Sequence, residues 1–274
     1  MAGARVKGTK SKTKAKKKKT YTPVMLQFLA AKEAHPDSLL FFRLGDFYEM
    51  FFEDAYRAAE LLGITQTFRG TDPNGERIAM AGVPHHAAAG YITRALKQGQ
   101  KVAICEQMAD PSTVKGVVPR EVVRVITPAL CLEDDALDAG EDNYLVALHA
   151  AEDSFGLAAF EMSTGNLRAC SLPDHAAIIA ELARLSPREV LFPLEGLEVL
   201  YEALEAGGGR AVLRRESHDM EGVLEEALGD EETVLEGPAR QAAALALAYA
   251  RKNLAGGALQ VQRVGHYDPR SHLV

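Results

Sequence analysis

The stretch from Phe42 to Phe52 constrains the fold of this chain more strongly than any other segment. Five of its eleven residues are aromatic, in a chain that has no Trp and only 10 Phe and 8 Tyr. Gly45-Asp46 is a turn signal between two apolar runs, so the sequence predicts a hairpin of two strands. Alternate side chains of a strand share one face, so Phe47 and Glu49 are expected to project together.

An aromatic ring next to a single carboxylate allows two interpretations. Most Phe side chains lie in a core, so the pattern alone favours a buried aromatic cluster with Glu49 as its solvated neighbour. In the alternative, the ring of Phe47 inserts between bases or stacks on them, and the carboxylate of Glu49 accepts a hydrogen bond from a base edge.

The segment Gly45-Asp46-Phe47-Tyr48-Glu49 resembles the Phe-x-Glu motif of the MutS family of DNA mismatch repair proteins. Other stretches resemble the same family in the same order: Thr22-Pro23, residues 80–86, residues 102–107, Lys115-Gly116 and residues 120–128. The resemblance extends over about residues 21–270. It therefore favours the nucleic-acid interpretation of Phe47 and Glu49.

The resemblance implies how these two residues act. Phe47 would stack on a mispaired base from the minor groove, and Glu49 would accept a hydrogen bond from that base. Kinking a duplex costs less where a pair is faulty, so an inserted ring distinguishes faulty from intact DNA. A carboxylate near phosphates also discourages binding to an intact duplex.

The resemblance also implies partners. The expected ligand is double-stranded DNA with mispaired bases or small insertion/deletion loops, bound in the bacterial cytoplasm at the nucleoid. The family acts as a homodimer, couples recognition to ATP and Mg in an ATPase domain, and signals to a repair protein of the MutL type. This chain has no Gly-x-x-x-x-Gly-Lys-[Ser/Thr] phosphate loop, so we expect neither a cofactor nor catalysis in these residues.

Cations are needed to bind the DNA backbone, because phosphate contacts supply the sequence-independent affinity. The candidates in the first domain are Arg69, Arg77, Lys115, Arg120 and Arg124. Arg69 is favoured because it lies in a predicted hairpin. Lys115 and Arg120 are favoured because they lie in a predicted flexible loop. Met80, in a stretch that resembles the family, is expected either beside Phe47 or in the core.

Composition divides the chain into parts. Residues 1–20 hold nine basic and no acidic residues, which predicts a disordered tail that either binds phosphates or only aids solubility. The other 22 Lys and Arg stand against 38 Asp and Glu, so the remainder carries −16, compared with −7 for the whole chain. Together with the resemblance, this division implies an α/β fold class: a mixed-sheet mismatch-recognition domain at 21–128, an acidic linker at 129–142, an RNase H-like connector domain at 143–254 and a connection to a helical core domain at 255–274.

Hydrophobic periodicity predicts the elements of both domains. The first is expected to have helices at about 23–33, 53–62 and 85–98, further strands at 38–43, 64–68, 78–80 and 101–107, and a buried strand at 121–126. The second is expected to begin with three antiparallel strands at 143–150, 155–162 and 167–171. Helices and strands then alternate up to an Ala-rich helix at 238–254, which should be buried and should have no closing element after it.

Two other classes of function stay open on the sequence. An RNase H-like fold can hold two metal ions on clustered carboxylates, and Glu161, Asp174 and Glu181 are the candidates for such a nuclease. The acidic second domain could instead act only as a protein-interaction module. The adjacent His85-His86 pair has no third ligand at a useful spacing, so no metal site is expected.

Other features concern the cellular compartment. Cys105, Cys131 and Cys170 are widely spaced and match neither a metal-ligand pattern nor a disulfide pattern, which indicates reduced thiols. No stretch approaches the ~18–20 apolar residues that a membrane-spanning helix needs. The N-terminus has no apolar region typical of a secretory signal.

Overall fold

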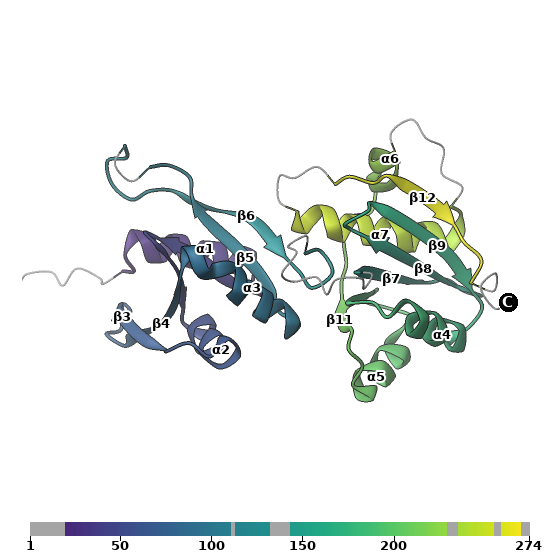
Figure 1. Cartoon of the computed structure of the whole chain (residues 1–274), viewed down its shortest axis with the longest axis horizontal. Helices are drawn as coiled ribbons and strands as arrows, with labels where there is room; N and C mark the ends of the chain where they lie inside the picture. The colour runs from purple at the N-terminus through teal and green to yellow at the C-terminus, as the bar shows by residue number, and fades with distance from the viewer. Residues whose placement is uncertain (1–19, 111–112, 132–142, 229–234, 255–258, 270–274) are drawn as a thin grey trace, which may run out of the picture.

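The structure, a computed structural model, describes residues 20–110, 113–131, 143–228, 235–254 and 259–269. Within them the chain forms two α/β units, each built on a six-stranded sheet. The units lie side by side along the long axis of the molecule (Figure 1). All but the last residue of the predicted tail at 1–20 lies outside the described residues.

The sheet of the first unit is covered on both faces. Its elements are α1 (Pro23–Ala34), β1 (Ser38–Leu44), β2 (Phe47–Phe51), α2 (Glu53–Leu62), β3 (Thr67–Thr71), β4 (Arg77–Pro84), α3 (Ala88–Lys97), β5 (Lys101–Gln107) and β6 (Arg120–Ile126). The strand order is β3-β4-β2-β1-β5-β6, with β1 and β5 parallel and the other pairs antiparallel. Leu39 and Phe41 belong to the core under α2 and α3, whereas Leu40 and Phe42 belong to the core under α1.

Local signals predicted most of these bounds. The Thr22 hydroxyl accepts a hydrogen bond from the Met25 amide at 3.3 Å, and Pro23 is the first residue of α1. The predicted helix at 53–62 and strand at 101–107 are confirmed residue for residue. The predicted helix at 85–98 is divided, because a 3-10 turn at His85–Ala87 precedes α3.

Three strands of the first unit differ from the prediction, of which β4 is longer, at Arg77–Pro84 instead of 78–80. β3 begins at Thr67 rather than Ile64, and its pairing with β4 shifts register between Phe68 and Thr71. Such a bulge interrupts the regular alternation from which strand bounds are read. The prediction that residues 121–126 form a buried strand is wrong, because β6 is an edge strand and Val123 is 36% exposed. A run rich in Val and Ile does not distinguish a central strand from an edge strand.

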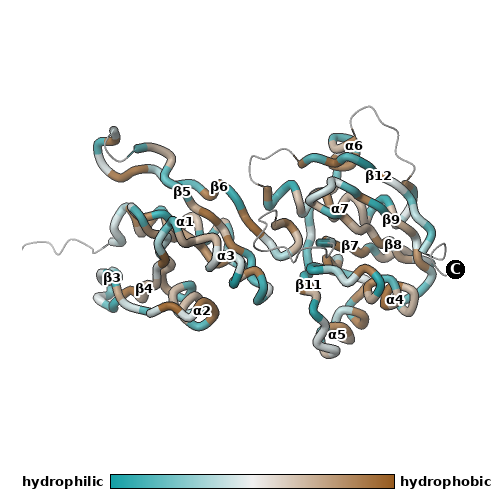
Figure 2. The backbone as a smooth tube through the Cα atoms, viewed as in Figure 1, coloured by the Kyte–Doolittle hydropathy of each residue, from teal (hydrophilic) through white to brown (hydrophobic). Residues whose placement is uncertain are grey.

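The second unit has the predicted RNase H-like layout. Its elements are β7 (Tyr144–Ala150), β8 (Phe155–Glu161), β9 (Asn166–Leu172), α4 (His175–Leu185), β10 (Glu189–Phe192), α5 (Glu198–Gly207), β11 (Val212–Arg215), α6 (Val223–Leu228), α7 (Gly237–Asn253) and β12 (Arg263–His266). The strand order is β11-β10-β7-β8-β9-β12, in which β7, β8 and β9 are antiparallel and β10 and β11 continue in parallel with β7. The Ala-rich α7 covers one face, as its composition predicted, and α4 and α5 cover the other (Figure 1). Hydrophobic stretches run through central strands such as β7 and β8 (Figure 2).

The second unit is longer than predicted at both ends. Ala129 and Leu130, expected in an acidic linker, are buried in the core under α7, and residues 132–142 lie outside the described residues. After α7, strand β12 pairs in parallel with β9. The sheet therefore extends past the predicted boundary at 254, and a closing strand does follow the Ala-rich helix. β12 has only four residues, too few for a periodic signal.

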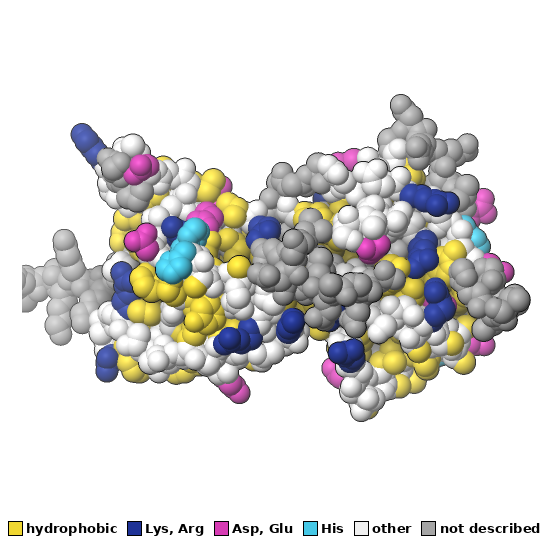
Figure 3. All heavy atoms as spheres, viewed as in Figure 1, with side chains coloured by type: hydrophobic (Ala, Val, Ile, Leu, Met, Phe, Trp, Pro, Cys, Tyr) yellow, Lys and Arg dark blue, Asp and Glu magenta, His cyan; other side chains and the backbone are white. Residues whose placement is uncertain are grey.

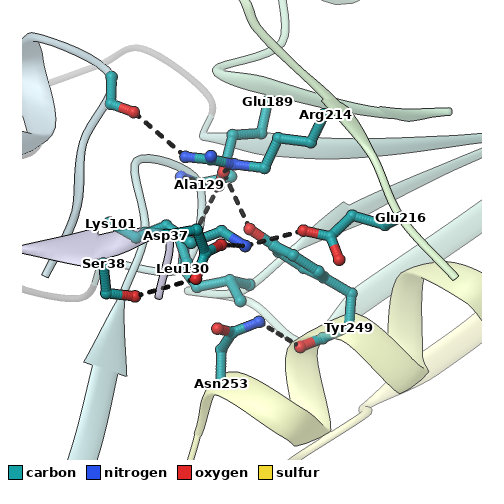
Figure 4. Close-up of polar contacts among 12 residues, drawn as sticks. Asp37, Ser38, Lys101, Ala129, Leu130, Glu189, Arg214, Glu216, Tyr249 and Asn253 are labelled. Atoms are coloured by element: carbon teal, nitrogen blue, oxygen red, sulfur yellow. Dashed lines mark hydrogen bonds and ion pairs between the residues drawn. The ribbon is translucent and has the colours of Figure 1, made fainter. Parts of the chain in front are cut away.

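The two units meet at Glu189, the first residue of β10, whose side chain is fully buried. Its carboxylate accepts hydrogen bonds from the Ala129 amide at 2.9 Å and from the Tyr249 hydroxyl at 3.0 Å (Figure 4). Arg214 donates to the same carboxylate and also, at 3.2 Å, to the Gly99 carbonyl of the first unit. One carboxylate thus links the segment after β6, strand β11 and helix α7.

We call the contacts of Glu189 and Lys101 between the two units the joint. Lys101 makes the second set of these contacts. Its Nζ lies 2.7 Å from Asp37 and 2.7 Å from Glu216, and 5.0 Å from the centre of the Tyr249 ring. Lys101 begins β5 and Asp37 precedes β1, so the joint lies at one end of two parallel strands. Burial by itself raises the pKa of Glu216, but hydrogen bonds from His218 and Lys101 and the charge of Lys101 outweigh it and lower the pKa to about 2.

Replacing Glu189 by Ala should destabilise the chain by about 3–5 kcal/mol, because Arg214 and the Tyr249 hydroxyl lose a buried partner. Urea denaturation measures this change in the free energy of unfolding. Glu202→Ala, on the exposed side of α5, is the matched control and should change stability by less than about 0.5 kcal/mol. A loss for Glu189→Ala no larger than that of the control would contradict the structural role of the joint.

The low pKa of Glu216 predicts an acid-sensitive contribution to stability. The folded carboxylate stays ionised down to about pH 2, whereas an ordinary carboxyl takes up a proton near pH 4.5. The contribution is therefore complete above pH 4.5 and is lost as the pH falls toward 2. The difference in unfolding free energy between the unchanged chain and Glu216→Gln should shrink over this range. A difference that stays constant with pH would contradict the ion pair with Lys101.

Candidate nucleic-acid interface

The turn Gly45-Asp46 determines where Phe47 lies. Leu44 pairs with Phe47 across the hairpin, so the loop has two residues. Such loops need a positive φ at their first residue, which Gly45 supplies with φ +60°. The Arg43 guanidinium donates to the Gly45 carbonyl at 2.6 Å, and the His85 amide donates to the Asp46 carbonyl at 2.8 Å. The turn is thus held from β1 on one side and from the end of β4 on the other.

Phe47 is exposed although its neighbours on β2 are core residues. The Phe47 side chain is 46% exposed, whereas Tyr48 is 5% and Met50 is 0% exposed. Tyr48 and Met50 belong to the core under α2 and α3. By the alternation of a strand, Phe47 and Glu49 therefore project from the opposite face of the sheet, as the sequence predicted. A buried aromatic cluster does not include Phe47.

Glu49 lies two residues further along β2. Its side chain is only 10% exposed, and Nη1 of Arg69 lies 2.5 and 2.6 Å from its two carboxylate oxygens. Gly82 stands opposite on β4, where an added β-carbon would come within 3.5 Å of the Glu49 side chain. Burial raises the pKa of Glu49, and the charge and hydrogen bonds of Arg69 offset only part of this rise. We call Phe47, Glu49 and Arg69 together the reading face.

The reading face is bordered by β3 and β4. Arg69 belongs to β3, in the hairpin that the sequence predicted, and its side chain is 52% exposed. Pro84 stands opposite Phe47 on β4, whereas Met80 stands opposite Phe51 and packs partly against the core under α1. Met80 therefore lies on the Glu49 side of the reading face and is not the cross-strand partner of Phe47.

Lys115 and Arg120 lie in different environments. Lys115 is exposed in the connection between β5 and β6, which leaves the sheet at the same end as the Gly45-Asp46 turn. Arg120 was expected in that flexible loop, but it is the first residue of β6. Its Nε donates to the Arg43 carbonyl at 2.7 Å and its Nη1 to the Val118 carbonyl at 2.8 Å. Arg120 thus reaches across β5 and holds the end of β1.

Sequence reasoning missed two contacts of this unit. The Tyr48 hydroxyl donates to Glu106 on β5, and the Arg77 guanidinium lies 4.1 Å above the ring of the exposed Phe68. Arg77, a candidate phosphate contact, therefore shields an aromatic ring. Neither pair leaves a local signal, since 58 positions separate Tyr48 from Glu106 and the β3–β4 hairpin brings Arg77 to Phe68.

The carboxylates considered for a nuclease have separate structural roles. Glu161 accepts a hydrogen bond from the Thr164 hydroxyl at 2.7 Å in the turn between β8 and β9. Asp174 caps α4, and Glu181 pairs with Arg184 at 2.5 Å. Among the described residues, no three His, Cys, Asp or Glu side chains are placed to hold a metal ion. The geometry therefore does not favour the nuclease alternative.

Charged side chains of both signs are scattered among uncharged ones (Figure 3). On the face shown in Figure 3, Lys and Arg side chains are scattered over both units and are interspersed with Asp and Glu. Cys105, Cys131 and Cys170 are buried, and none of these three forms a disulfide. None of the helices in the described part of the chain has the length and apolarity to cross a bilayer.

Comparison with known proteins agrees with this architecture. Residues 22–135 match the family model of MutS domain I, and residues 143–260 match that of MutS domain II. The chain is 43% identical to the DNA mismatch repair protein MutS of Sorangium cellulosum over 272 residues, which cover 92% of the chain and 29% of that protein. It is 46% identical to the protein of the same name from Anaeromyxobacter sp. over 200 residues, 73% of the chain and 22% of that protein.

The chain thus spans less than a third of the length of these curated relatives. The two matched segments correspond to the two units of the structure, the first with the reading face and the second with the RNase H-like layout. The chain belongs to the MutS family and contains its domains I and II.

Proposed function

We propose that this chain binds duplex DNA at mispaired bases and small insertion/deletion loops, with Phe47 inserted from the minor groove and Glu49 accepting a hydrogen bond from the displaced base. The observation that carries this proposal is the exposure of Phe47 at an anchored turn, while the residues beside it on β2 are buried. An apolar ring held rigidly at the surface is suited to wedge between bases.

Discrimination follows from the cost of deforming DNA. Unstacking a base step costs a few kcal/mol, and this cost is lower where a pair is faulty. The Phe47 ring does not need to identify each base pair, because its insertion depends on the free-energy cost of unstacking the base step. The Glu49 carboxylate then stabilises a base that has left its pair, since a carboxylate accepts hydrogen bonds from base donors.

Cations around the reading face supply the contacts to phosphate in this proposal. Lys115 is exposed at the same end of the sheet as the Gly45-Asp46 turn and is suited to reach a backbone phosphate. Arg69 belongs to the reading face and has half of its side chain in solvent. Met80 supports the strand surface next to Glu49, and Arg120 supports the end of β1 through its contact with Arg43.

The longer relatives suggest the context in which this binding acts. In this proposal the chain itself performs no chemistry and binds no cofactor, and the ATP and Mg of the family belong to an ATPase domain outside these residues. Binding at a mispair would pass through the second unit to that domain, in a homodimer that recruits a MutL-type repair protein at the bacterial nucleoid in the cytoplasm.

Phe47→Ala should abolish the preference for a duplex with one G·T mispair over the matched duplex. The loss should be about 1–3 kcal/mol of binding free energy, the usual value of one base stacked on an aromatic ring. Fluorescence anisotropy of labelled duplexes measures both affinities. Val199→Ala, which also truncates an exposed apolar side chain but lies in the second unit, is the control and should keep the preference. Undiminished preference in Phe47→Ala would refute the wedge.

Deleting residues 1–19 tests how much of the binding is sequence-independent. This segment contains nine Lys and Arg and no acid, so its removal should weaken binding to matched and mispaired duplexes equally. The slope of log affinity against log salt should fall by roughly 0.9 for each phosphate that the tail neutralises in the unchanged chain. Loss of the mispair preference itself would show that the tail, and not the reading face, discriminates.

A further inference from the structure

The direction of the Phe47 ring depends on the strand that carries it. Phe47 is the first residue of β2 and its side chain is 46% exposed, so little protein surrounds the ring. Leu44, its partner across the turn, is itself only partly buried. An inserted ring separates bases only if it does not tilt away from them, so the start of β2 has to be held firmly.

Tyr48 holds this end of β2 from the other face of the sheet. It follows Phe47 along the strand, points to the opposite face and is only 5% exposed. Its hydroxyl donates a hydrogen bond to Glu106, which lies on β5. Strand β1 runs between β2 and β5, so the Tyr48 side chain reaches across a whole strand. One side chain therefore ties the start of β2 to a strand that is not its neighbour.

The Tyr48 ring is enclosed along this path. The guanidinium of Arg43, its partner on β1, lies 5.6 Å from the ring centre. The rings of Phe41 and His85 lie 5.8 and 5.3 Å from the Tyr48 ring, measured between centres. Burial raises the pKa of Tyr48, and the hydrogen bond and the charge of Glu106 raise this pKa further. The hydroxyl therefore keeps its proton at neutral pH and acts as the donor.

We propose that Tyr48 is a positioning residue for mismatch reading: its hydrogen bond to Glu106 fixes the start of β2, and with it the direction in which Phe47 enters the base stack. This inference rests on the proposed function and adds to it the contact that braces the Phe47 ring against the sheet. Neighbouring residues of a strand share one backbone, so a fixed Tyr48 also fixes the direction in which the Phe47 side chain leaves the strand. Resistance from the base stack is then taken up by β5, an interior strand, and not by the exposed turn.

Tyr48→Phe removes the hydroxyl and keeps the ring, so the core around the ring should stay packed. We expect the preference for a G·T duplex over the matched duplex to fall by about three- to tenfold, the equivalent of one net hydrogen bond. Affinity for the matched duplex should not change, because phosphate contacts supply it. Fluorescence anisotropy measures both affinities. Tyr56→Phe, which removes the hydroxyl of an exposed tyrosine on α2, is the matched control and should keep the preference.

A double-mutant cycle determines whether Tyr48 acts through Phe47. The cycle compares the unchanged 274-residue chain with Phe47→Ala, Tyr48→Phe and both changes together, each against matched and G·T duplexes. In the Phe47→Ala background there is no ring to direct, so adding Tyr48→Phe should change neither affinity. A residue that contributes only to folding would lower both affinities by the same factor in either background.

Two replacements of Glu106 separate its hydrogen bond from its charge. Glu106→Gln keeps an acceptor oxygen for the Tyr48 hydroxyl, so the mispair preference should stay within about twofold of that of the unchanged chain. Glu106→Met has a similar length and no oxygen, and should lower the preference as much as Tyr48→Phe does. Combining Glu106→Met with Tyr48→Phe should cost no more than either change alone, because both remove the same bond.

A fluorescent base reports the effect of the ring on the stack. 2-Aminopurine placed beside the mispair fluoresces more strongly when it is unstacked. With the duplex saturated by protein, the unchanged chain and Glu106→Gln should raise this fluorescence equally, and Tyr48→Phe should raise it less. Because saturation removes differences in affinity, a loss of stability alone would not alter the signal.

Two results would overturn the role of Tyr48. One is a Tyr48→Phe chain that keeps both the mispair preference and the 2-aminopurine signal of the unchanged chain. The other is a Tyr48→Phe change that lowers both affinities equally, with and without the Phe47 ring. Urea denaturation verifies that each variant is folded under the binding conditions. If Tyr48→Phe is unfolded there, the comparison of Glu106→Met with Glu106→Gln makes the same test.

Failure of the proposed function has a different signature. If the unchanged chain itself binds both duplexes equally, the proposed mismatch recognition by this chain is wrong, and the role of Tyr48 falls with it. A preference that Phe47→Ala abolishes and Tyr48→Phe keeps would leave the proposed function intact and refute only the role of Tyr48.

Discussion

The buried carboxylate of Glu189 is the interaction on which the arrangement of the two units depends. A charge removed from water is stable only if its partners surround it, and the partners of Glu189 come from three separate segments. They are the Thr127 hydroxyl and the Ala129 amide after β6, Arg214 on β11 and the Tyr249 hydroxyl on α7. The hydrophobic core of each sheet could form without its neighbour. Through the Thr127 hydroxyl directly after β6, and through Arg214, which also donates to the Gly99 carbonyl, the Glu189 carboxylate connects the second unit to the first.

The same joint is connected directly to the reading face. Lys101 and Asp37 lie at the ends of β5 and β1, and β1 runs from there into the Gly45-Asp46 turn. A strand of seven residues spans roughly 23 Å, so one extended segment connects the joint to Phe47. The Arg120 contact with Arg43 and the Tyr48 contact with Glu106 hold this end of the sheet together. The reading face is therefore built on a rigid frame, although Phe47 itself is exposed.

Much of the site could be predicted, because its signals are local. The two-residue turn and the alternation of β2 placed Phe47 and Glu49 on one face, away from Tyr48 and Met50, and the structure agrees. The environment of Glu49 could not be predicted in the same way. Arg69 is 20 positions away, and the register of β3 against β4, including its bulge, brings the two side chains together. Arg120 was misplaced for a similar reason, since nothing local marks the start of an edge strand.

The sequence by itself determined the helix start at Thr22-Pro23, the hairpin around Gly45-Asp46, the α/β class of both units and the burial of the Ala-rich helix. These features depend on neighbouring residues, through capping, turn geometry and hydrophobic period. Only the tertiary structure decided that β12 closes the second sheet and that β6 is an edge strand. It also decided that Glu49 pairs with Arg69 and Glu189 with Arg214. Those outcomes depend on contacts between distant segments, because a buried carboxylate needs a partner wherever the fold can supply one.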